Sequence, residues 1–282
     1  MDGGESRDMK KLALLLMLLA CISVSFALFA TVKEPVSQTL YARNSMQLGN
    51  AGPGQTIYLV VDRGTDGGNC PNDYCTDGWD TVVATKLPSG WLVEPSPYYE
   101  NPMKVKIKIA PDAYDGQYNL TLVAVDEGNY NGLGNMTFYV VVNVSRDVFE
   151  ISVDPTRVET GVGQPALYNI RIRNTGAASD PFEIKAHEGD LPAWNFKKSV
   201  LVNYGSERVI PYEVVLDEEN VKVFNIEVTS LSSPLIHKDM SVVVDSKSSL
   251  VTDWKATTHG VLIFPALEQL IYGLVGLLSG LL

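Results

Sequence analysis

Apolar and polar residues alternate along most of the chain, between two continuous apolar runs near its ends. Residues 104–109 and 168–173 alternate strictly with a period of two, which is the pattern of a strand buried on one face. Residues 116–125 and 136–142 are rich in branched and aromatic side chains, which favour strands. No long helical periodicity appears between residues 35 and 250. The pattern predicts an all-β middle region, whose strands are separated by turns rich in Gly, Pro, Asn and Asp.

Two copies of one pattern make up this middle region. A glycine-containing turn precedes a strand pattern at residues 52–55 and again at 161–164, and a Leu-Pro segment ending in tryptophan follows at 87–91 and at 191–194. The offset between the copies stays between 104 and 109 residues. A repeat of about 100 residues has the size of an immunoglobulin domain. We therefore expect two tandem Ig-like β-sandwiches.

The repeat sets the predicted domain boundaries. The first sandwich is expected at residues 31–147 and includes a cysteine-containing loop, and the second is expected at 148–250. Only residues 144–149 separate their strand patterns, which predicts a fairly stiff tandem. In the first domain, Asp115-Gly116-Gln117-Tyr118 looks like a tyrosine corner, in which the phenol bonds to nearby backbone.

The second domain carries three motifs of a known kind of module. A strand pattern ends in Asn174-Thr175-Gly176, a Leu-Pro-Ala-Trp segment follows at 191–194, and Tyr204-Gly205-Ser206-Glu207 opens another strand. On these motifs, residues 161–230 resemble the Ig-like modules of archaeal and bacterial membrane-anchored surface proteins, similar to the CARDB type and to the NPCBM-associated sandwich of α-galactosidases. The first domain lacks the Asn-x-Gly turn and inserts a loop at 63–80. The resemblance implies a β-sandwich and leaves the activity open, because such modules have many uses.

Residues 1–30 are expected to be a signal peptide or a signal anchor. Met9-Lys10-Lys11 precedes a 19-residue apolar run, as in a secretory signal. About 20 residues cross a bilayer, so retention as an anchor and cleavage after the small residues near Ala27 or Ala30 both stay open. Cys21 follows a lipobox-like Leu-Leu-Ala, but ten apolar or small residues come after it, so we place it in the apolar core of the segment.

Residues 259–282 are expected to form a C-terminal transmembrane helix. The last 22 residues are largely apolar and would extend about 33 Å as a helix, which is enough to cross a bilayer. Glu268 lies in the first third of this run, and Gly273, Gly276 and Gly280 recur at spacings that let helices approach closely. Two interpretations stay open: a plain membrane tail, and a helix that packs on a partner with Glu268 as a polar contact.

The loop at residues 62–80 is the most distinctive stretch of the first domain. It contains Cys70 and Cys75, and the only other cysteine of the chain is Cys21. In an exported chain the two loop cysteines are expected to form a disulfide, which would stabilise so short a loop by about 2 kcal/mol. A two-cysteine metal site is the alternative, although no histidine lies near it.

Five aspartates surround the two cysteines. They could supply the oxygen ligands that calcium takes, but their spacing does not fit an EF-hand, and turns alone favour Asp, Asn and Gly. Recognition is a third use, because loops on rigid sandwiches often carry binding and exposed aromatic side chains dominate contact surfaces. Burial of the tryptophan in the core is the alternative to that role. The candidate residues for calcium or recognition are Asp62, Asp66, Asp73, Asp77, Asp80, Tyr74 and Trp79.

Three asparagines begin sequons for N-glycosylation. They are Asn119, Asn135 and Asn143, each followed two residues later by Thr or Ser. All three lie in the first domain and none in the second. If the sequons are used, their side chains must point to solvent.

Composition and motif content narrow the function classes. The chain has 33 acidic and 22 basic residues, a net charge of −11, whereas nucleic-acid-binding proteins cluster Lys and Arg. Its histidines, His187, His237 and His259, lie in separate segments, and there is no H-E-x-x-H motif, nucleophile elbow or phosphate-binding glycine loop. We expect no nucleic-acid partner, no enzymatic activity and, calcium aside, no cofactor.

These features predict a membrane-anchored protein with both sandwiches on the extracellular side. The first hypothesis is a non-catalytic module for envelope structure or protein interaction. The second is an accessory subunit of a membrane complex, docked through Glu268 and the neighbouring glycines. The third is a carbohydrate-binding module that stacks sugars on Trp79 or Trp91. The expected partners are the membrane itself and either envelope proteins or a membrane complex.

Overall fold

The computed structural model describes residues 28–65, 78–130, 132–188 and 191–248. Within these ranges the chain is built of strands, apart from one short 3-10 turn at Glu127–Asn129. The predicted all-β class is thereby confirmed for the middle of the chain. Among the described residues, no helix is long and apolar enough to cross a membrane.

The first strand begins earlier than the sequence pattern predicts. β1 (Phe29–Glu34) includes two residues that the pattern assigns to the apolar N-terminal segment. Ala30 is buried, and the ring of Phe29 meets that of Tyr41 edge-on with centroids 6.3 Å apart. These apolar side chains therefore belong to the first sandwich. The rest of the predicted N-terminal segment and the predicted helix at 259–282 lie outside the described residues.

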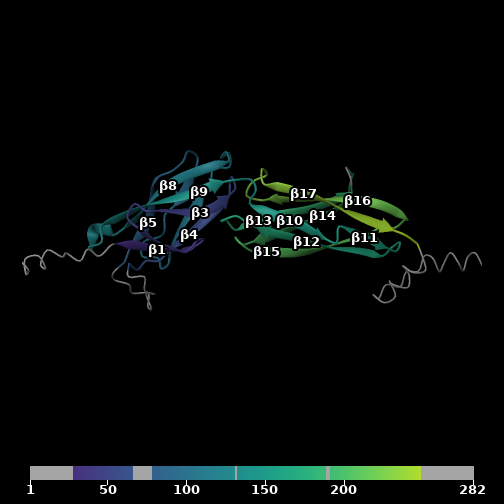
Figure 1. Cartoon of the computed structure of the whole chain (residues 1–282), viewed down its shortest axis with the longest axis horizontal. Helices are drawn as coiled ribbons and strands as arrows, with labels where there is room; N and C mark the ends of the chain where they lie inside the picture. The colour runs from purple at the N-terminus through teal and green to yellow at the C-terminus, as the bar shows by residue number, and fades with distance from the viewer. Residues whose placement is uncertain (1–27, 66–77, 131, 189–190, 249–282) are drawn as a thin grey trace, which may run out of the picture.

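The first domain consists of two sheets packed face to face (Figure 1). One has five strands in the order β2-β1-β4-β7-β6, and the other has four in the order β3-β9-β8-β5. The remaining strands of this domain are β2 (Gln38–Tyr41), β3 (Ser45–Ala51), β4 (Thr56–Val61), β5 (Thr81–Lys86), β6 (Leu92–Glu94), β7 (Met103–Lys108), β8 (Gly116–Val125) and β9 (Asn135–Val144).

The second domain is also a sandwich of two sheets. It has a three-stranded sheet, β10-β12-β15, and a five-stranded sheet, β11-β17-β16-β13-β14. In both domains a short edge strand pairs in parallel with the last strand, β3 with β9 and β11 with β17. The strands are β10 (Phe149–Asp154), β11 (Arg157–Thr160), β12 (Pro165–Asn174), β13 (Asp180–Glu188), β14 (Leu191–Val202), β15 (Glu207–Val215), β16 (Asn220–Ser230) and β17 (His237–Ser246).

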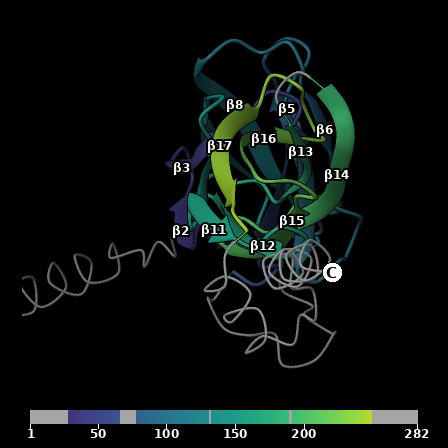
Figure 2. The same cartoon turned by 90° about the vertical axis from the view of Figure 1, so that its right-hand side faces the viewer.

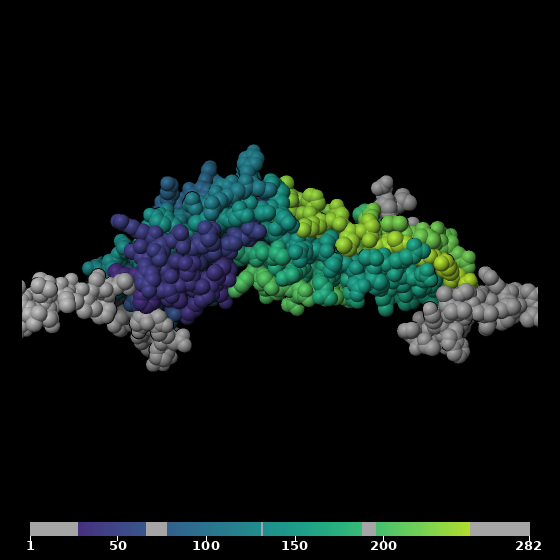
Figure 3. All heavy atoms as spheres, in the orientation of Figure 1, coloured from purple at the N-terminus to yellow at the C-terminus, as the bar shows by residue number. Residues whose placement is uncertain are grey.

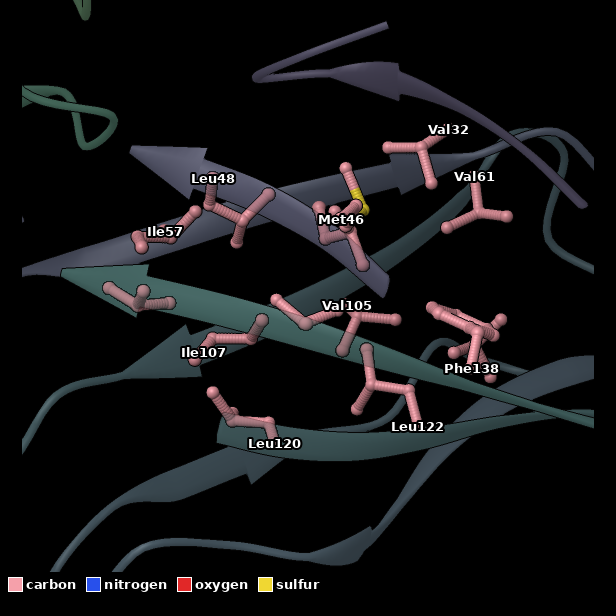
Figure 4. Packing of buried hydrophobic residues seen from close by; sticks show 14 of the residues in the cluster. Val32, Met46, Leu48, Ile57, Val61, Val105, Ile107, Leu120, Leu122 and Phe138 are labelled. Carbon is pink, nitrogen blue, oxygen red and sulfur yellow. The ribbon is translucent and has the colours of Figure 1, made fainter. Parts of the chain in front are cut away.

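Each sandwich has a core formed mainly by the inward side chains of its own strands, and Ala178 of the second domain packs against the core of the first. In β7, Met103, Val105 and Ile107 are buried, and lysines alternate with them on the outer face, as the period-two pattern predicts. They pack against β8 and β9, from which Leu122 and Phe138 reach into the same layer (Figure 4). A second cluster fills the other sandwich. Burial of apolar side chains, at roughly 25 cal/mol per Å², is the main stabilising contribution in both.

The two domains meet end to end in a junction that buries polar groups. Asp180 is 0% exposed and accepts hydrogen bonds from Gln55 Nε2 at 2.5 Å and from the hydroxyls of Ser230 and Ser232, each at 2.6 Å. Gln55 Oε1 in turn accepts from the Gly52 amide at 2.7 Å. A buried carboxylate is costly unless it is hydrogen-bonded. The network therefore favours one arrangement of the two domains.

Close approach of backbone supports the same junction. A Cβ at Gly54, whose φ is +77°, would lie 2.5 Å from the Ser232 carbonyl oxygen, so only glycine fits here. The Ala177 amide donates to the Asn50 carbonyl at 2.7 Å. The two sandwiches form a rod, and their surfaces are in contact at its middle (Figure 3). Viewed along the long axis of the rod, one sandwich lies in front of the other (Figure 2). The first strand, β1, begins and the last strand, β17, ends at opposite ends of the rod (Figure 1).

Candidate functional site

The base of the loop at 62–80 closes the free end of the first domain. Gly64 and Gly78 form an isolated antiparallel bridge, and the Trp79 amide donates to the Arg63 carbonyl at 2.9 Å. A Cβ at Gly78 would lie 2.4 Å from that carbonyl oxygen, so the narrow stem requires glycine. The predicted disulfide, Cys70–Cys75, and the candidates Asp66, Asp73, Tyr74 and Asp77 lie outside the described residues.

The two aspartates that flank the loop are engaged with cations of the protein itself. Asp62 is buried and forms an ion pair with Lys33 at 2.9 Å. Asp80 is also buried; its Oδ1 lies 3.3 Å from Arg63 Nη2, and its Oδ2 accepts from the Glu127 amide at 2.7 Å. Within the described ranges, no cluster of His, Cys, Asp and Glu could hold a metal ion. Asp62 and Asp80 thus pair with cations of the protein itself, and calcium binding by the loop stays a prediction.

Trp79 and Trp91 are core residues. Trp79 is 0% exposed, and its Nε1 donates to the Phe29 carbonyl at 3.1 Å. Trp91 is 4% exposed and packs on Tyr118 with ring centroids 5.4 Å apart. A ring that binds a sugar or a partner must present a free face, so the recognition role of Trp79 and the sugar-stacking role of both tryptophans are wrong. The alternative that places Trp79 in the core is confirmed.

Exposed tyrosines surround the base of the loop instead. Tyr98, Tyr99 and Tyr130 are 55%, 56% and 88% exposed. The rings of Tyr98 and Tyr99 have centroids 6.0 Å apart, and the Arg63 guanidinium lies 5.2 Å from the centre of the Tyr99 ring, within range of a cation–π interaction. We call Arg63, Tyr98, Tyr99 and Tyr130 the tip patch. It combines exposed aromatic area with a buried ionic base.

The backbone and the charges around Tyr99 hold its ring in place. Its φ of +62° is unusual for a bulky residue, and such strain persists only where the surroundings impose it. Its amide donates to the Asp80 carbonyl at 2.8 Å. Desolvation first, and then the charges of Asp80 and Glu127, raise the pKa of Tyr99 above 10.0. The phenol is therefore neutral at physiological pH and can donate or accept a hydrogen bond.

Sequence reasoning missed the tyrosines of the tip patch. They lie outside the alternating strand patterns, in the turn segments Pro97-Tyr98-Tyr99 and Gly128-Asn129-Tyr130. A signal was present, because an aromatic residue within a Gly-, Pro- or Asn-rich turn has no predicted core to enter. Only the fold shows that the two turns are neighbours, since the amides of Tyr99 and Glu127 both donate to Asp80.

The remaining predicted site residues fall into two groups. Asn119, Asn135 and Asn143 are exposed on β8 and β9, which meets the condition for glycosylation without testing it. Glu268, Gly273, Gly276 and Gly280 lie outside the described residues, so the packing role of the C-terminal segment stays a prediction.

A hollow of about 760 Å³ lies at the far end of the second domain, beside the β15–β16 turn. Its walls include the aromatic rings of Phe196, Tyr212 and Phe224 and the charged side chains of Glu218 and Lys222. Burial raises the pKa of Tyr212 to about 12. The described lining contains no histidine, cysteine or serine.

Comparisons of this chain with known proteins find only weak similarity, and only to solved structures. No family model matches the chain, and no curated protein sequence matches it. A chimeric titin Z1Z2 tandem is 10% identical, covers 79% of this chain and 100% of its own, and has a TM-score of 0.36. The CARDB domain of a Pyrococcus furiosus protein, solved in complex with di-metal ions, is 14% identical over 37% of this chain and 94% of its own, with a TM-score of 0.28. A chain from the complex of zinc 2-glycoprotein and prolactin-inducible protein from human seminal plasma is 6% identical over 36% of this chain and 95% of its own, with a TM-score of 0.30.

Proposed function

We propose that the protein is a non-catalytic cell-surface module, anchored by its C-terminal segment, that presents the tip patch to a protein partner. The observation that carries this proposal is the set of three exposed tyrosines on a buried ionic base. Tyrosine supplies a large amphipathic contact area and loses little conformational entropy on binding, because its side chain has only two χ angles. Arginine and tyrosine are also the residue types that dominate binding energy at interfaces.

The length of the rod separates the tip patch from the C-terminal segment. The predicted membrane segment at 259–282 follows β17, which ends at the opposite end of the molecule from the tip patch (Figure 1). The hydrogen-bonded junction at Asp180 keeps the two sandwiches aligned. With the C-terminal segment in the membrane, the tip patch would lie at the distal end, where a partner can approach it.

Crosslinking in native membranes, followed by affinity purification and mass spectrometry, tests this function. The full-length protein should capture a protein partner, and replacement of Tyr98, Tyr99 and Tyr130 by Ser should lower the yield at least about tenfold, the effect of losing about 1.4 kcal/mol. The control is Tyr114→Ser, because Tyr114 is 80% exposed but lies in the β7–β8 connection, at the junction end of the domain.

Two outcomes would overturn the proposal. An unchanged yield with the triple variant would mean that the tip patch is not the contact surface. A partner that survives the triple variant but is lost with Glu268→Leu would indicate the other hypothesis, an accessory subunit docked through its C-terminal segment.

The geometry also favours one fate for the N-terminal segment. The chain enters β1 at the tip, so a retained N-terminal anchor would hold the tip patch against the membrane. Cleavage after Ala30 would remove a buried core residue, whereas cleavage after Ala27 leaves β1 intact. We therefore expect a mature N-terminus at Leu28, measured by N-terminal peptide mass spectrometry of protein from the source membranes. A retained peptide from residues 9–27 would contradict this expectation.

A further inference from the structure

The outer face of the four-stranded sheet in the first domain is uncharged at its centre. Along β8 and β9 the inward side chains alternate with ten outward positions, five on each strand, and these carry only Asn, Gln, Thr, Val and Tyr. On the neighbouring β3, the outward residues Ser45, Gln47 and Asn50 are also uncharged. Charged residues border this face: Lys86, beyond a register shift in β5, pairs with Thr121, and the Arg43 amide donates to the Thr137 carbonyl.

The other three sheets differ from this face. β7 places Lys104, Lys106 and Lys108 on its outer side, the β12–β15 pair carries Arg171 and Glu207 in an exposed ion pair, and β13 carries Glu183 between two lysines. Charged residues make up 20% of the whole chain, and soluble surfaces normally intersperse them. A central sheet surface without charged side chains is therefore unusual in so acidic a chain.

All three sequons of the chain lie on this uncharged face. Asn119 is on β8, Asn135 and Asn143 are on β9, and all three side chains are exposed. Residues i and i+2 of a strand share one face, so Thr121 and Thr137 lie on the same side as the asparagines that they follow. The sequon residues thus occupy five of the ten outward positions of β8 and β9.

The register places the three sites along the length of the face. Asn119 is paired with Val141, so it is diagonal to Asn143, about 7–8 Å away. Asn135 lies eight residues before Asn143 along β9, about 27 Å at 3.4 Å per residue. Asn143 Nδ2 donates to Asn50 Oδ1 at 2.8 Å; an N-linked sugar replaces one of its two hydrogens and leaves one for this bond.

We propose that this face is covered by N-linked glycans at Asn119, Asn135 and Asn143. In each transfer, a bond forms between asparagine Nδ2 and the anomeric carbon of an oligosaccharide carried on a lipid diphosphate. The bond between that carbon and the phosphate oxygen breaks, the phosphate takes the electron pair, and Nδ2 loses one proton. The glycans supply hydration on a face whose central strands carry no charged side chain.

Mass spectrometry of the full-length protein from the source membranes tests the proposal. Peptides that contain Asn119, Asn135 and Asn143 should carry glycan mass increments. Thr121→Val, Thr137→Val and Ser145→Ala should each abolish the increment at their own sequon and increase gel mobility by one step. Thr85→Val is the matched control, because Thr85 is an exposed threonine on the same sheet outside any sequon, and it should change nothing.

Glycans at two or three of the sites support the proposal. Modification at one site or none overturns it, as would a second copy or a protein partner found by crosslinking on an unmodified face. The wild-type measurement needs no variant to fold. Because modification requires export, protease accessibility on intact cells is measured in parallel. An exported but unmodified protein refutes the glycan face alone, whereas a protein that is not exported refutes the proposed surface function.

Discussion

Arg63 joins the buried and exposed parts of the tip. Its Nη2 lies 3.3 Å from Asp80 Oδ1, its Nε donates to the Trp79 carbonyl at 2.9 Å, and its guanidinium lies 5.2 Å from the centre of the Tyr99 ring. The side chains of Arg63 and Asp80 are 9% and 4% exposed. Removing one partner of a buried ion pair leaves an uncompensated charge. Arg63 therefore matters for the stability of the first domain as well as for the tip patch.

Arg63→Met should lower the free energy of unfolding by about 3–5 kcal/mol. Arg173→Met is the control, because Arg173 pairs with Glu150 at 3.8 Å across an exposed surface, where ion pairs contribute about 0–1 kcal/mol. Urea unfolding of both variants, followed by tryptophan fluorescence, measures the difference. Equal effects would contradict a buried role for Arg63.

Asp245 should make stability depend on pH in the acid range. Hydrogen bonds from Lys247 and Arg157 lower its pKa below 3.8. A carboxyl whose pKa is lowered on folding stabilises the folded state above its unfolded pKa, and this stabilisation is lost as the pH falls through the folded pKa. The Tm difference between wild type and Asp245→Asn should thus be constant above about pH 5 and shrink below pH 3.8. Calorimetry at pH 7, 5, 4 and 3 measures it, and a difference that grew on acidification would refute the assignment.

At the scale of elements, the connection between β7 and β8 is fixed by a tyrosine corner. Tyr118 Oη donates to the Tyr114 carbonyl at 3.1 Å, as the motif at 115–118 predicts. The same ring packs on Trp91. The Tyr118 side chain thus stabilises the turn that precedes β8 and also packs at the edge of the hydrophobic core of the first domain.

Tyr118→Phe should destabilise the first domain by about 0.5–1.5 kcal/mol, because it removes one hydrogen bond and keeps the ring. Tyr114→Phe is the matched control: its backbone carbonyl remains as acceptor, and its own ring is 80% exposed. Thermal unfolding of the two variants compares them. A control that lost as much stability as Tyr118→Phe would show that the bond contributes nothing.

At the scale of the whole molecule, the junction determines how the rod behaves. Asp180 receives all its hydrogen bonds from neutral donors, and one of them, Gln55, belongs to the other domain. The Lys238–Asp147 ion pair at 2.6 Å bridges the linker to β17. Burial and Glu34, which lies on β1, raise the pKa of Tyr204. The turn motif at 204–207 thus lies at the junction.

Gln55→Ala should loosen the rod. It removes a donor from a buried carboxylate, which costs about 1–3 kcal/mol, and it removes a contact between the domains. Small-angle X-ray scattering should show a broader distribution of interatomic distances than in wild type, and the first unfolding transition should move to lower temperature. Gln117→Ala, on the exposed face of β8, should change neither. An unchanged scattering profile for Gln55→Ala would mean that the remaining contacts suffice.

The sequence by itself determined the all-β class, the repeat and the tyrosine corner. These depend on period-two alternation and turn residues, which act between neighbours along the chain. The sequence pattern also assigned Phe29 and Ala30 to the N-terminal apolar segment, although they belong to the first strand of the sandwich. An apolar run looks the same in a terminal segment and in a buried strand.

Only the tertiary structure decided what the chemistry-bearing residues do. In the sequence, Asp62 and Asp80 are candidate metal ligands. In the structure, Asp62 forms an ion pair with Lys33, and Asp80 forms one with Arg63. Trp79 resembles a loop anchor until the core closes over it. Tyr99 and Tyr130 become one surface, and Gln55 meets Asp180 across 125 residues of chain. The physical reason is the same each time: burial and charge pairing depend on which surfaces packing brings together, and local patterns do not contain that information.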